Sequence, residues 1–417
     1  MSYSEESLDK LESGNLEEFE NSFKKALDND TPEILYSLAE ELYSLGFTSH
    51  AKRIYEQGLK NDPDEDVYKI NLAEIAIDDD DIDTAINFLS DINKNSDEYL
   101  RALLVMADLY QTQELFEVSE QKLLEAYRIA PDEPVITFAL AEFYYSTRNY
   151  RKAIAEYLKL IRQGVTSLSS VNIVERLGVS YAEIGQFENA VGYLDQIKQV
   201  DMNSDVKFEL GFTYLKLKDY KKAIGVFEDL LENDPNYTSL YPALADAYIE
   251  DNQVDKALVT IQEGLSVDQY NEKLWLKAAK IANRASNDQL VTEYLIKGLE
   301  IDPENYELIS MLADWYINNN QYQEVIDLLT PLNDENSLDS ILKWNLASAN
   351  AELGNINEAV QLYQQAENEL VEEPDFLKES ALFFREVGDV QKSNQLVKLY
   401  LQIVPNDFEM NSLLDDY

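Results

Sequence analysis

Apart from its many carboxylates, this chain has few side chains that could do acid–base or metal chemistry. His50 is the only histidine among 417 residues, and there is no cysteine. A histidine-based triad and a histidine-rich metal site are therefore disfavoured, and thiol chemistry is excluded, because each needs side chains that the chain lacks. We predict that His50 is a surface residue at the start of a helix.

One run of carboxylates, Asp78 to Asp81 with Asp83, suggests a calcium site. The run lacks the alternating spacing and the central glycine of a loop that wraps the ion, and it falls where a turn between two helices is expected. A solvated turn is the preferred interpretation, with calcium as the alternative. No glycine-rich phosphate loop is present either. We predict no catalytic residue, no metal site and no cofactor.

The elements that must position these side chains are set by a repeat. A small residue recurs at steps of 34 residues, with one step of 37 and one of 33, at Ala51, Ala85, Ser119, Ala153, Ala190, Ala223, Ala257, Val291, Val325, Ala359 and Ser393. A second small residue precedes each of them, at Ala39, Ala73, Ala107, Ala141, Gly178, Gly211, Ala245, Ala279, Ala313, Ala347 and Ala381. Such a period indicates an array in which each unit buries its apolar face on its neighbours.

Residues 204–237 show the content of one unit. Apolar positions fall at helical spacing on two short stretches, which Lys218 and Asp219 separate. Pro235 closes the unit, because proline cannot continue a helix. Each unit is therefore predicted to be helix A, a tight turn, helix B and an exit marked in several units by proline. Several turns carry a glycine, which tolerates a left-handed backbone, at Gly46, Gly185, Gly354 and Gly388.

With these residues in place, the chain resembles the tetratricopeptide-repeat family. Trp275 matches repeat position 4, Leu210 with Gly211 matches positions 7 and 8, and Tyr214 matches position 11. The small residues listed above match positions 8 and 20, Phe227 matches position 24, and Pro235 matches position 32. Eleven repeats begin near residues 32, 66, 100, 134, 171, 204, 238, 272, 306, 340 and 374. The resemblance implies an all-α, right-handed α-solenoid of antiparallel helix pairs.

This resemblance also divides the chain. Residues 1–31 are expected to form N-terminal capping helices, 32–165 repeats one to four, 171–407 repeats five to eleven, and 408–417 a C-terminal cap helix packed through Phe408, Leu413 and Leu414. Ends need such caps because a terminal repeat has no neighbour to cover it. The longer connection at residues 163–170 is a harmless insertion in one interpretation and a hinge in the other.

The formal net charge of −46 is unevenly distributed: residues 1–133 and 238–417 each carry −22, and residues 134–237 carry −2. Nucleic acid is disfavoured as a partner, because phosphate binding needs a basic field. Solvated acid that keeps a long array soluble is one interpretation of the total. No apolar run approaches the ~18–20 residues of a membrane helix, and the N-terminus is acidic, so we expect no membrane insertion and a cytoplasmic protein.

The resemblance implies that helix A lines the inner face, chiefly through positions 2, 5, 9 and 12. Position 9 is acidic in the first four repeats, with aromatics beside it at positions 5 and 12, and two phenylalanines follow in repeat six. The partner-binding residues predicted in this way are Glu40, Glu74, Asp108, Glu142, Tyr36, Tyr43, Phe138, Tyr145, Phe208 and Phe212. In the alternative interpretation, the aromatic side chains only fill the inner wall.

We expect a non-catalytic scaffold or adaptor that binds another protein or peptide in its concave groove. A groove in which acidic residues flank an apolar centre suits a basic segment with apolar anchors. A peptide-responsive regulatory protein is the alternative, although such receptors usually add a further segment. An enzyme such as a repeat-bearing glycosyltransferase is a third class, and it would need a nucleotide-sugar domain beyond the repeats.

Overall fold

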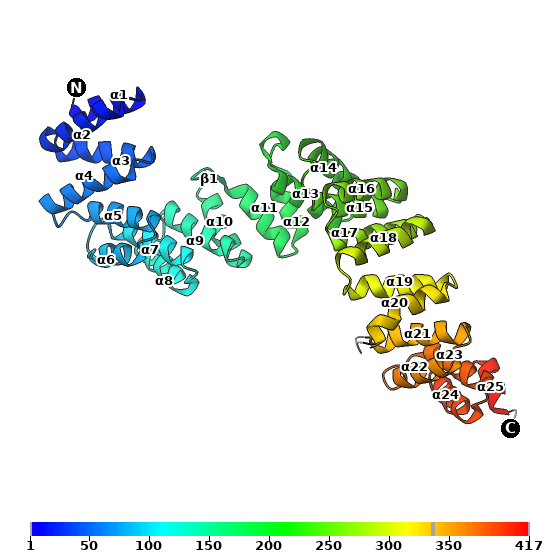
Figure 1. Cartoon of the computed structure of the whole chain (residues 1–417). Coiled ribbons are helices and arrows are strands. Elements are labelled where there is room, and N and C mark those ends of the chain that lie inside the picture. The colour runs from blue at the N-terminus through cyan, green and yellow to red at the C-terminus, as the bar shows by residue number, and fades with distance from the viewer. Residues whose placement is uncertain (1, 335–337, 416–417) are drawn as a thin grey trace. The chain divides into compact units, whose positions relative to one another are not determined.

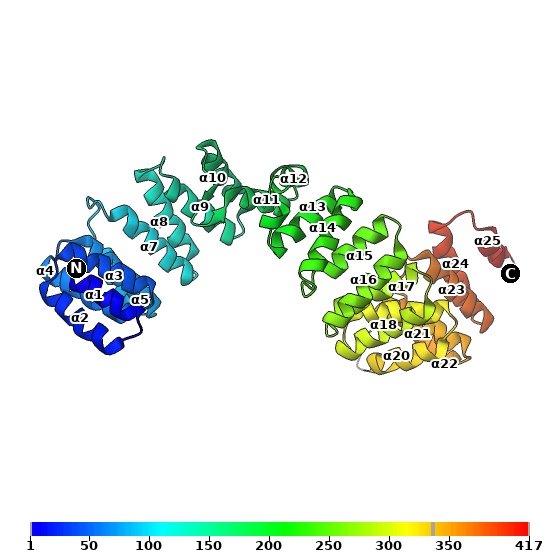
Figure 2. The ribbon, with the colours of Figure 1, turned by 90° about the horizontal axis from the view of Figure 1, so that it is seen from above.

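The computed structural model describes residues 2–334 and 338–415, in which antiparallel helix pairs follow one another along the chain (Figures 1 and 2). The chain divides into two compact units, Met1–Thr213 and Tyr214–Tyr417. The predicted all-α class is confirmed.

The first unit begins with a helix pair, in which Phe19, Phe23 and Ala26 of the second helix are buried; that this pair caps the array stays a prediction. Repeats one to five follow, and the unit ends inside helix A of repeat six. Its helices are α1 (Tyr3–Glu12), α2 (Leu16–Asn29), α3 (Pro32–Ser44), α4 (Thr48–Asn61), α5 (Asp66–Asp78), α6 (Ile82–Ser90), α7 (Tyr99–Thr112), α8 (Phe116–Ile129), α9 (Pro134–Ser146), α10 (Tyr150–Arg162), α11 (Ile173–Glu183), α12 (Phe187–Leu194), the 3-10 helix η1 (Gln199–Asp201) and α13 (Ser204–Lys216).

The second unit carries the remaining repeats and the C-terminal cap. Its helices are α14 (Tyr220–Asn233), α15 (Leu240–Glu250), α16 (Val254–Val267), α17 (Glu272–Arg284), α18 (Asp288–Ile301), α19 (Tyr306–Asn318), α20 (Tyr322–Asp334), α21 (Ser340–Glu352), α22 (Ile356–Ala366), α23 (Pro374–Glu386), α24 (Val390–Ile403) and α25 (Phe408–Asp415). In both units helix A begins within two residues of each repeat start predicted from the sequence.

The small residues are the points at which helices A and B touch. All eleven residues of the series at position 20 are fully buried, with 0% exposure. Where that residue is serine, its hydroxyl donates to the carbonyl of the small residue at position 8: Ser119 to Ala107 at 2.7 Å, and Ser393 to Ala381 at 2.8 Å. The repeat register read from the sequence is therefore confirmed.

The turn between helices A and B has a left-handed residue at position 15 of every repeat. The four predicted glycines have φ between 75° and 90°. Seven further repeats place a residue with a side chain in the same conformation, with φ between 55° and 62°, at Asp80, Glu114, Arg148, Lys218, Asn252, Ser286 and Asn320. Such residues carry a steric cost that glycine does not.

Glu114→Gly should therefore raise the free energy of unfolding by about 0.5–1 kcal/mol, because it relieves the left-handed strain at an exposed turn. Glu117→Gly is the matched control: it lies in the first turn of α8, where glycine loses helix propensity and should destabilise. Urea unfolding followed by circular dichroism compares the two. A loss of stability in both variants would contradict the strain argument.

The connection at residues 163–170 leads into the β-strands of the described chain. β1 (Ser167–Leu168) pairs antiparallel with β2 (Val171–Asn172) around the left-handed residues Ser169 and Ser170. The Asn172 side chain then accepts from the backbone N–H groups of Val174 and Glu175 and caps α11. The connection is thus an ordered hairpin, and its action as a hinge stays a prediction.

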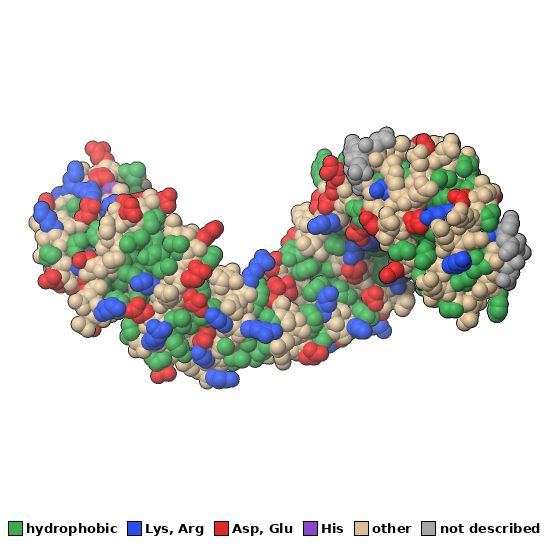
Figure 3. Space-filling view, turned by 90° about the horizontal axis from the view of Figure 1, so that it is seen from below, with side chains coloured by type: hydrophobic (Ala, Val, Ile, Leu, Met, Phe, Trp, Pro, Cys, Tyr) green, Lys and Arg blue, Asp and Glu red, His purple; other side chains and the backbone are tan. Residues whose placement is uncertain are grey.

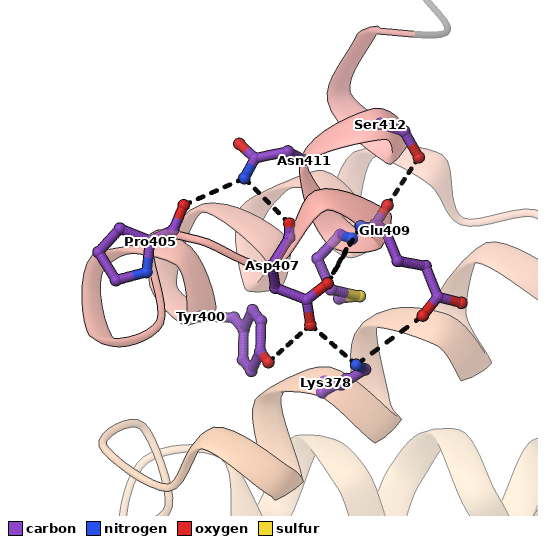
Figure 4. Close-up of polar contacts among 8 residues, drawn as sticks. Lys378, Tyr400, Pro405, Asp407, Glu409, Asn411 and Ser412 are labelled. Atoms are coloured by element: carbon purple, nitrogen blue, oxygen red, sulfur yellow. Dashed lines mark hydrogen bonds and ion pairs between the residues drawn. The ribbon is translucent and has the colours of Figure 1, made fainter.

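Helix α25 is held by the carboxylate of Asp407, as Figure 4 shows. One oxygen accepts from Lys378 Nζ at 2.8 Å and from the Tyr400 hydroxyl at 2.9 Å. The other accepts the first backbone N–H groups of the helix, including that of Met410 at 3.1 Å. Met410 is fully buried, whereas Phe408 is 86% exposed, so the prediction that Phe408 packs the cap was wrong.

The bond from Lys378, followed by those from the Met410 backbone and Tyr400, lowers the pKa of Asp407 to about 2. Because this pKa is depressed in the folded state, the ionised Asp407 stabilises the fold fully above the ordinary pKa of 3.8. This stabilisation is lost as the pH falls toward 2. We expect the Met410 methyl resonance to show α25 loosening over that window. Asp407→Asn should loosen it at pH 7, and the control Glu372→Gln, which removes an exposed carboxylate from the loop before α23, should not. An Asp407→Asn spectrum like that of the parent would contradict this role.

Candidate functional site

The four predicted acids lie at the same place on successive A helices, α3, α5, α7 and α9. A helices of neighbouring repeats contact one another at α5–α7 in the first unit and at α19–α21 in the second. On the face that Figure 3 draws, hydrophobic side chains lie exposed among acidic and basic ones. Glu40 and Asp108 are exposed, whereas Glu74 and Glu142 are half-buried.

Glu40 and Glu74 accept hydrogen bonds from other side chains of the same protein. The Tyr55 hydroxyl donates to Glu40 Oε1 at 2.5 Å, and Asn71 Nδ2 donates to the same oxygen at 3.2 Å. Arg101 pairs with Glu74 at 3.0 Å and also donates to Asn71 Oδ1 at 2.6 Å. Burial raises the pKa of Glu74 despite the opposing effect of Arg101.

Glu142 is the most strongly engaged of the four acids. The Arg176 guanidinium donates two hydrogen bonds to the Glu142 carboxylate. Nε donates to Oε1 at 3.1 Å, and a terminal nitrogen donates to Oε2 at 3.2 Å. The Tyr157 hydroxyl also donates to Oε1. The same guanidinium lies 4.2 Å from the centre of the Tyr145 ring. An internal cation therefore already occupies both the acid and the aromatic face beside it.

Two of these contacts follow a rule that was not recognised in the sequence, whereas Glu74 pairs with Arg101, at position 2 of the next repeat. The acid at position 9 of one repeat accepts from the residue at position 6 of the next, as in Glu40–Asn71 and Glu142–Arg176 in the first unit. In the second unit the rule holds for Lys277 with Asp246 at 2.5 Å and for Asn345 with Asp314 at 2.8 Å. The separation is 31 residues, or 34 across the longer connection, so the sequence contained the signal.

The predicted aromatics differ in their access to solvent. Tyr36 and Tyr43 are half-buried: the Tyr36 hydroxyl accepts from Asn71, and the Tyr43 hydroxyl donates to Asp78 Oδ2 at 2.6 Å. Tyr145 is half-buried beside Arg176. Phe138 is only 9% exposed and lies in the core of the first unit, so the structure does not bring it to the surface with the others.

Phe208 and Phe212 form a stacked pair on α13, with ring centres 6.1 Å apart. Glu209 lies between them in sequence and was not singled out from the sequence. Burial raises the pKa of Glu209 to about 7, with a further contribution from the like charges of Glu183 and Asp205. The position-9 residue of the preceding repeat is Val179, so Glu209 faces a repeat without the usual acid there.

The two side-chain groups that first suggested chemistry have structural places. Asp79 to Asp81 lie in the turn between α5 and α6, as predicted, whereas Asp78 is the last residue of α5; the Asp81 carboxylate caps α6 through the Thr84 N–H. His50 lies at the start of α4, as predicted, but it is half-buried: its ring packs on Phe19, Phe23 and Phe47, and Nε2 lies 2.8 Å from Glu20. Across the described residues, no group of three or more His, Cys, Asp or Glu side chains is arranged to hold a metal.

Within the same described ranges, no helix is both long and apolar enough to cross a membrane. The A helices of the first unit carry exposed carboxylates, tyrosine hydroxyls and half-buried aromatic rings.

Comparison with family profiles gives four matches along the chain. The profile of YpiA-like tetratricopeptide repeats matches residues 111–165, and that of YpiA-like C-terminal tetratricopeptide repeats matches residues 341–407. A general tetratricopeptide-repeat profile matches residues 214–281, and the ARM-repeat profile of tetratricopeptide repeat protein 21 matches residues 5–115.

Among characterised sequences, the chain is 35% identical to the TPR repeat-containing protein YpiA of Bacillus subtilis, over 96% of this chain and 94% of that protein. It is 23% identical to tetratricopeptide repeat protein 21B of Xenopus laevis, over 93% of this chain but only 29% of that longer protein.

Among solved structures, the C-terminal part of a TPR repeat-containing protein from Cytophaga hutchinsonii matches with a TM-score of 0.47 and 16% identity, over 66% of this chain and 99% of that one. MamA from Desulfovibrio magneticus matches with a TM-score of 0.38 and 18% identity, over 42% of this chain and 97% of that one.

Proposed function

We infer, because this chain belongs to the YpiA-like family of tetratricopeptide-repeat proteins, that it is a non-catalytic interaction scaffold. We propose that it holds a segment of another protein on the A helices of its first unit. Proteins built from such repeats generally serve as interaction scaffolds, and their stacked repeats create extended binding surfaces.

The observation that carries this proposal is the set of acids and aromatic rings that recurs on successive A helices. Glu40 and Asp108 project exposed carboxylates, and Tyr36, Tyr43 and Tyr145 lie half-buried beside the acids. Half-buried rings offer flat apolar contact area, and their hydroxyls can bond a partner's backbone. Phe208 and Phe212 add a stacked apolar pair at the end of the same unit.

The proposed partner segment is basic with apolar anchors, because its charge complements a strongly acidic protein. Internal ion pairs limit the acids to which its cations would bind under this proposal. Arg101 and Arg176 already neutralise Glu74 and Glu142, so a partner's Lys or Arg would have to compete with them there. Glu40 and Asp108 are the acids of this set whose exposure leaves room for a partner's charge.

Crosslinking tests the surface. A photo-crosslinking amino acid at Asp108, on helix A of repeat three, should capture a partner protein in cells. The same amino acid at Gln121, exposed on helix B of that repeat, is the matched control and should not capture it. Equal capture at both positions would contradict the proposed face.

The isolated partner then tests the charge. Glu40→Gln with Asp108→Asn should weaken its binding about 2- to 10-fold at low salt and remove most of its salt dependence, because exposed pairs act mainly on association. Glu56→Gln with Glu117→Gln removes the same charge from exposed positions of B helices and should leave binding unchanged.

We also propose that the protein is cytoplasmic. Cell fractionation tests this location.

A further inference from the structure

A cavity of about 790 Å³ lies between the last two repeats, on α21, α22 and α23 of the second unit. Its lining combines three glutamates with apolar side chains: Glu352, Glu379, Glu386, Ile356, Leu382 and Tyr363. We propose that this cavity is a docking site for a basic segment of a partner protein, one that places an arginine or lysine among the glutamates and an adjacent apolar residue on Leu382 and Ile356.

Charge complementarity selects this occupant. No Lys or Arg is among the residues that line the cavity, and within the described ranges none of the three glutamates forms an ion pair. The first unit differs, because Arg101 and Arg176 neutralise its half-buried acids internally. The residues that line the cavity therefore supply no cation to its glutamates, whereas the half-buried acids of the first unit each have an arginine.

The hydrogen bonds of Glu379 fix its carboxylate at the cavity wall. Trp344 Nε1 donates to Glu379 Oε1 at 2.9 Å, and the Tyr363 hydroxyl donates to the same oxygen at 2.7 Å. Both donors are neutral groups, so the carboxylate is oriented without losing its charge. Burial, and then Glu352 and Glu379, raise the pKa of Tyr322 on neighbouring α20, which agrees with an acidic field at this place.

Apolar surface lies beside this charge. Leu382 and Ile356 are each 39% exposed, and the buried rings of Tyr363 and Phe383 lie beneath them, 4.8 Å apart. Long basic side chains have apolar stems that suit such a surface, with the charged head at the carboxylates. A basic residue followed by an aliphatic one satisfies both parts of the lining.

This site shares no residue with the proposed binding surface of the first unit, so either proposal can fail while the other stands. Its test uses a defined probe, the peptide acetyl-Gly-Leu-Arg-Leu-Arg-Gly-amide. The chain has three tryptophans, and each gives one indole N–H signal in a nitrogen-15 NMR spectrum. The Trp344 signal, assigned with Trp344→Phe, reports on Glu379, whereas Trp275 donates to the Gln269 carbonyl and serves as an internal control.

We expect the peptide to shift the Trp344 signal to saturation and to leave that of Trp275 in place. Glu352→Gln with Glu386→Gln should raise the apparent Kd of the peptide at least about fivefold, because two complementary charges are lost. The control pair Glu304→Gln with Glu372→Gln removes equal charge from exposed loops of the same unit and should bind as the parent does. Leu382→Asn should also weaken binding, through the apolar contact.

Three results would overturn the proposal. The first is unchanged peptide affinity in the Glu352→Gln, Glu386→Gln protein. The second is binding of the peptide without movement of the Trp344 signal, which would place it elsewhere. The third is a Trp344 signal that moves with protein concentration before any peptide is added, which would mean that a second copy of the chain fills the cavity.

Discussion

The structure depends on one close contact, repeated along the chain, between the small residue at position 8 of helix A and the small residue at position 20 of helix B. Both sets are buried in every repeat. Where position 20 is serine, its hydroxyl bonds the backbone at position 8, so the side chain of one helix touches the main chain of the other. This approach sets the geometry of each helix pair, and hence the face that each pair offers to its neighbour.

Several acids of helix A form bonds between neighbouring repeats and therefore help to hold the array together. Bonds such as Arg176–Glu142 and Lys277–Asp246 join position 9 of one repeat to position 6 of the next. They place part of the large negative charge within internal pairs. The two proposed binding sites depend on acids outside such pairs, namely exposed Asp108 and the glutamates of the cavity in the last two repeats.

Much of the fold could be predicted from the sequence, because a fixed period and small residues at two positions define the helix pairs. A tight turn was predicted in every repeat, but its left-handed backbone only where glycine marks it; Glu114 and Arg148 adopt the same backbone because the short turn imposes it. The candidate site was predicted less well. Sequence position placed Glu142 on the correct helix, but its partner Arg176 was not recognised although their spacing repeats along the chain, and Phe138 is buried by packing that position alone does not reveal. Equally, nothing in the local sequence at Phe408 showed that Met410 would anchor the cap instead.

The most direct test compares two identical substitutions on helix α10. Ala153, at position 20, is fully buried, whereas Ala155, two residues along the same helix, is exposed. If the close contact controls the array, Ala153→Leu should lower the free energy of unfolding by about 1–3 kcal/mol through overpacking, as measured by urea unfolding. Ala155→Leu should change it by less than about 0.5 kcal/mol. Equal stability of the two variants would contradict the claim that this contact organises the protein.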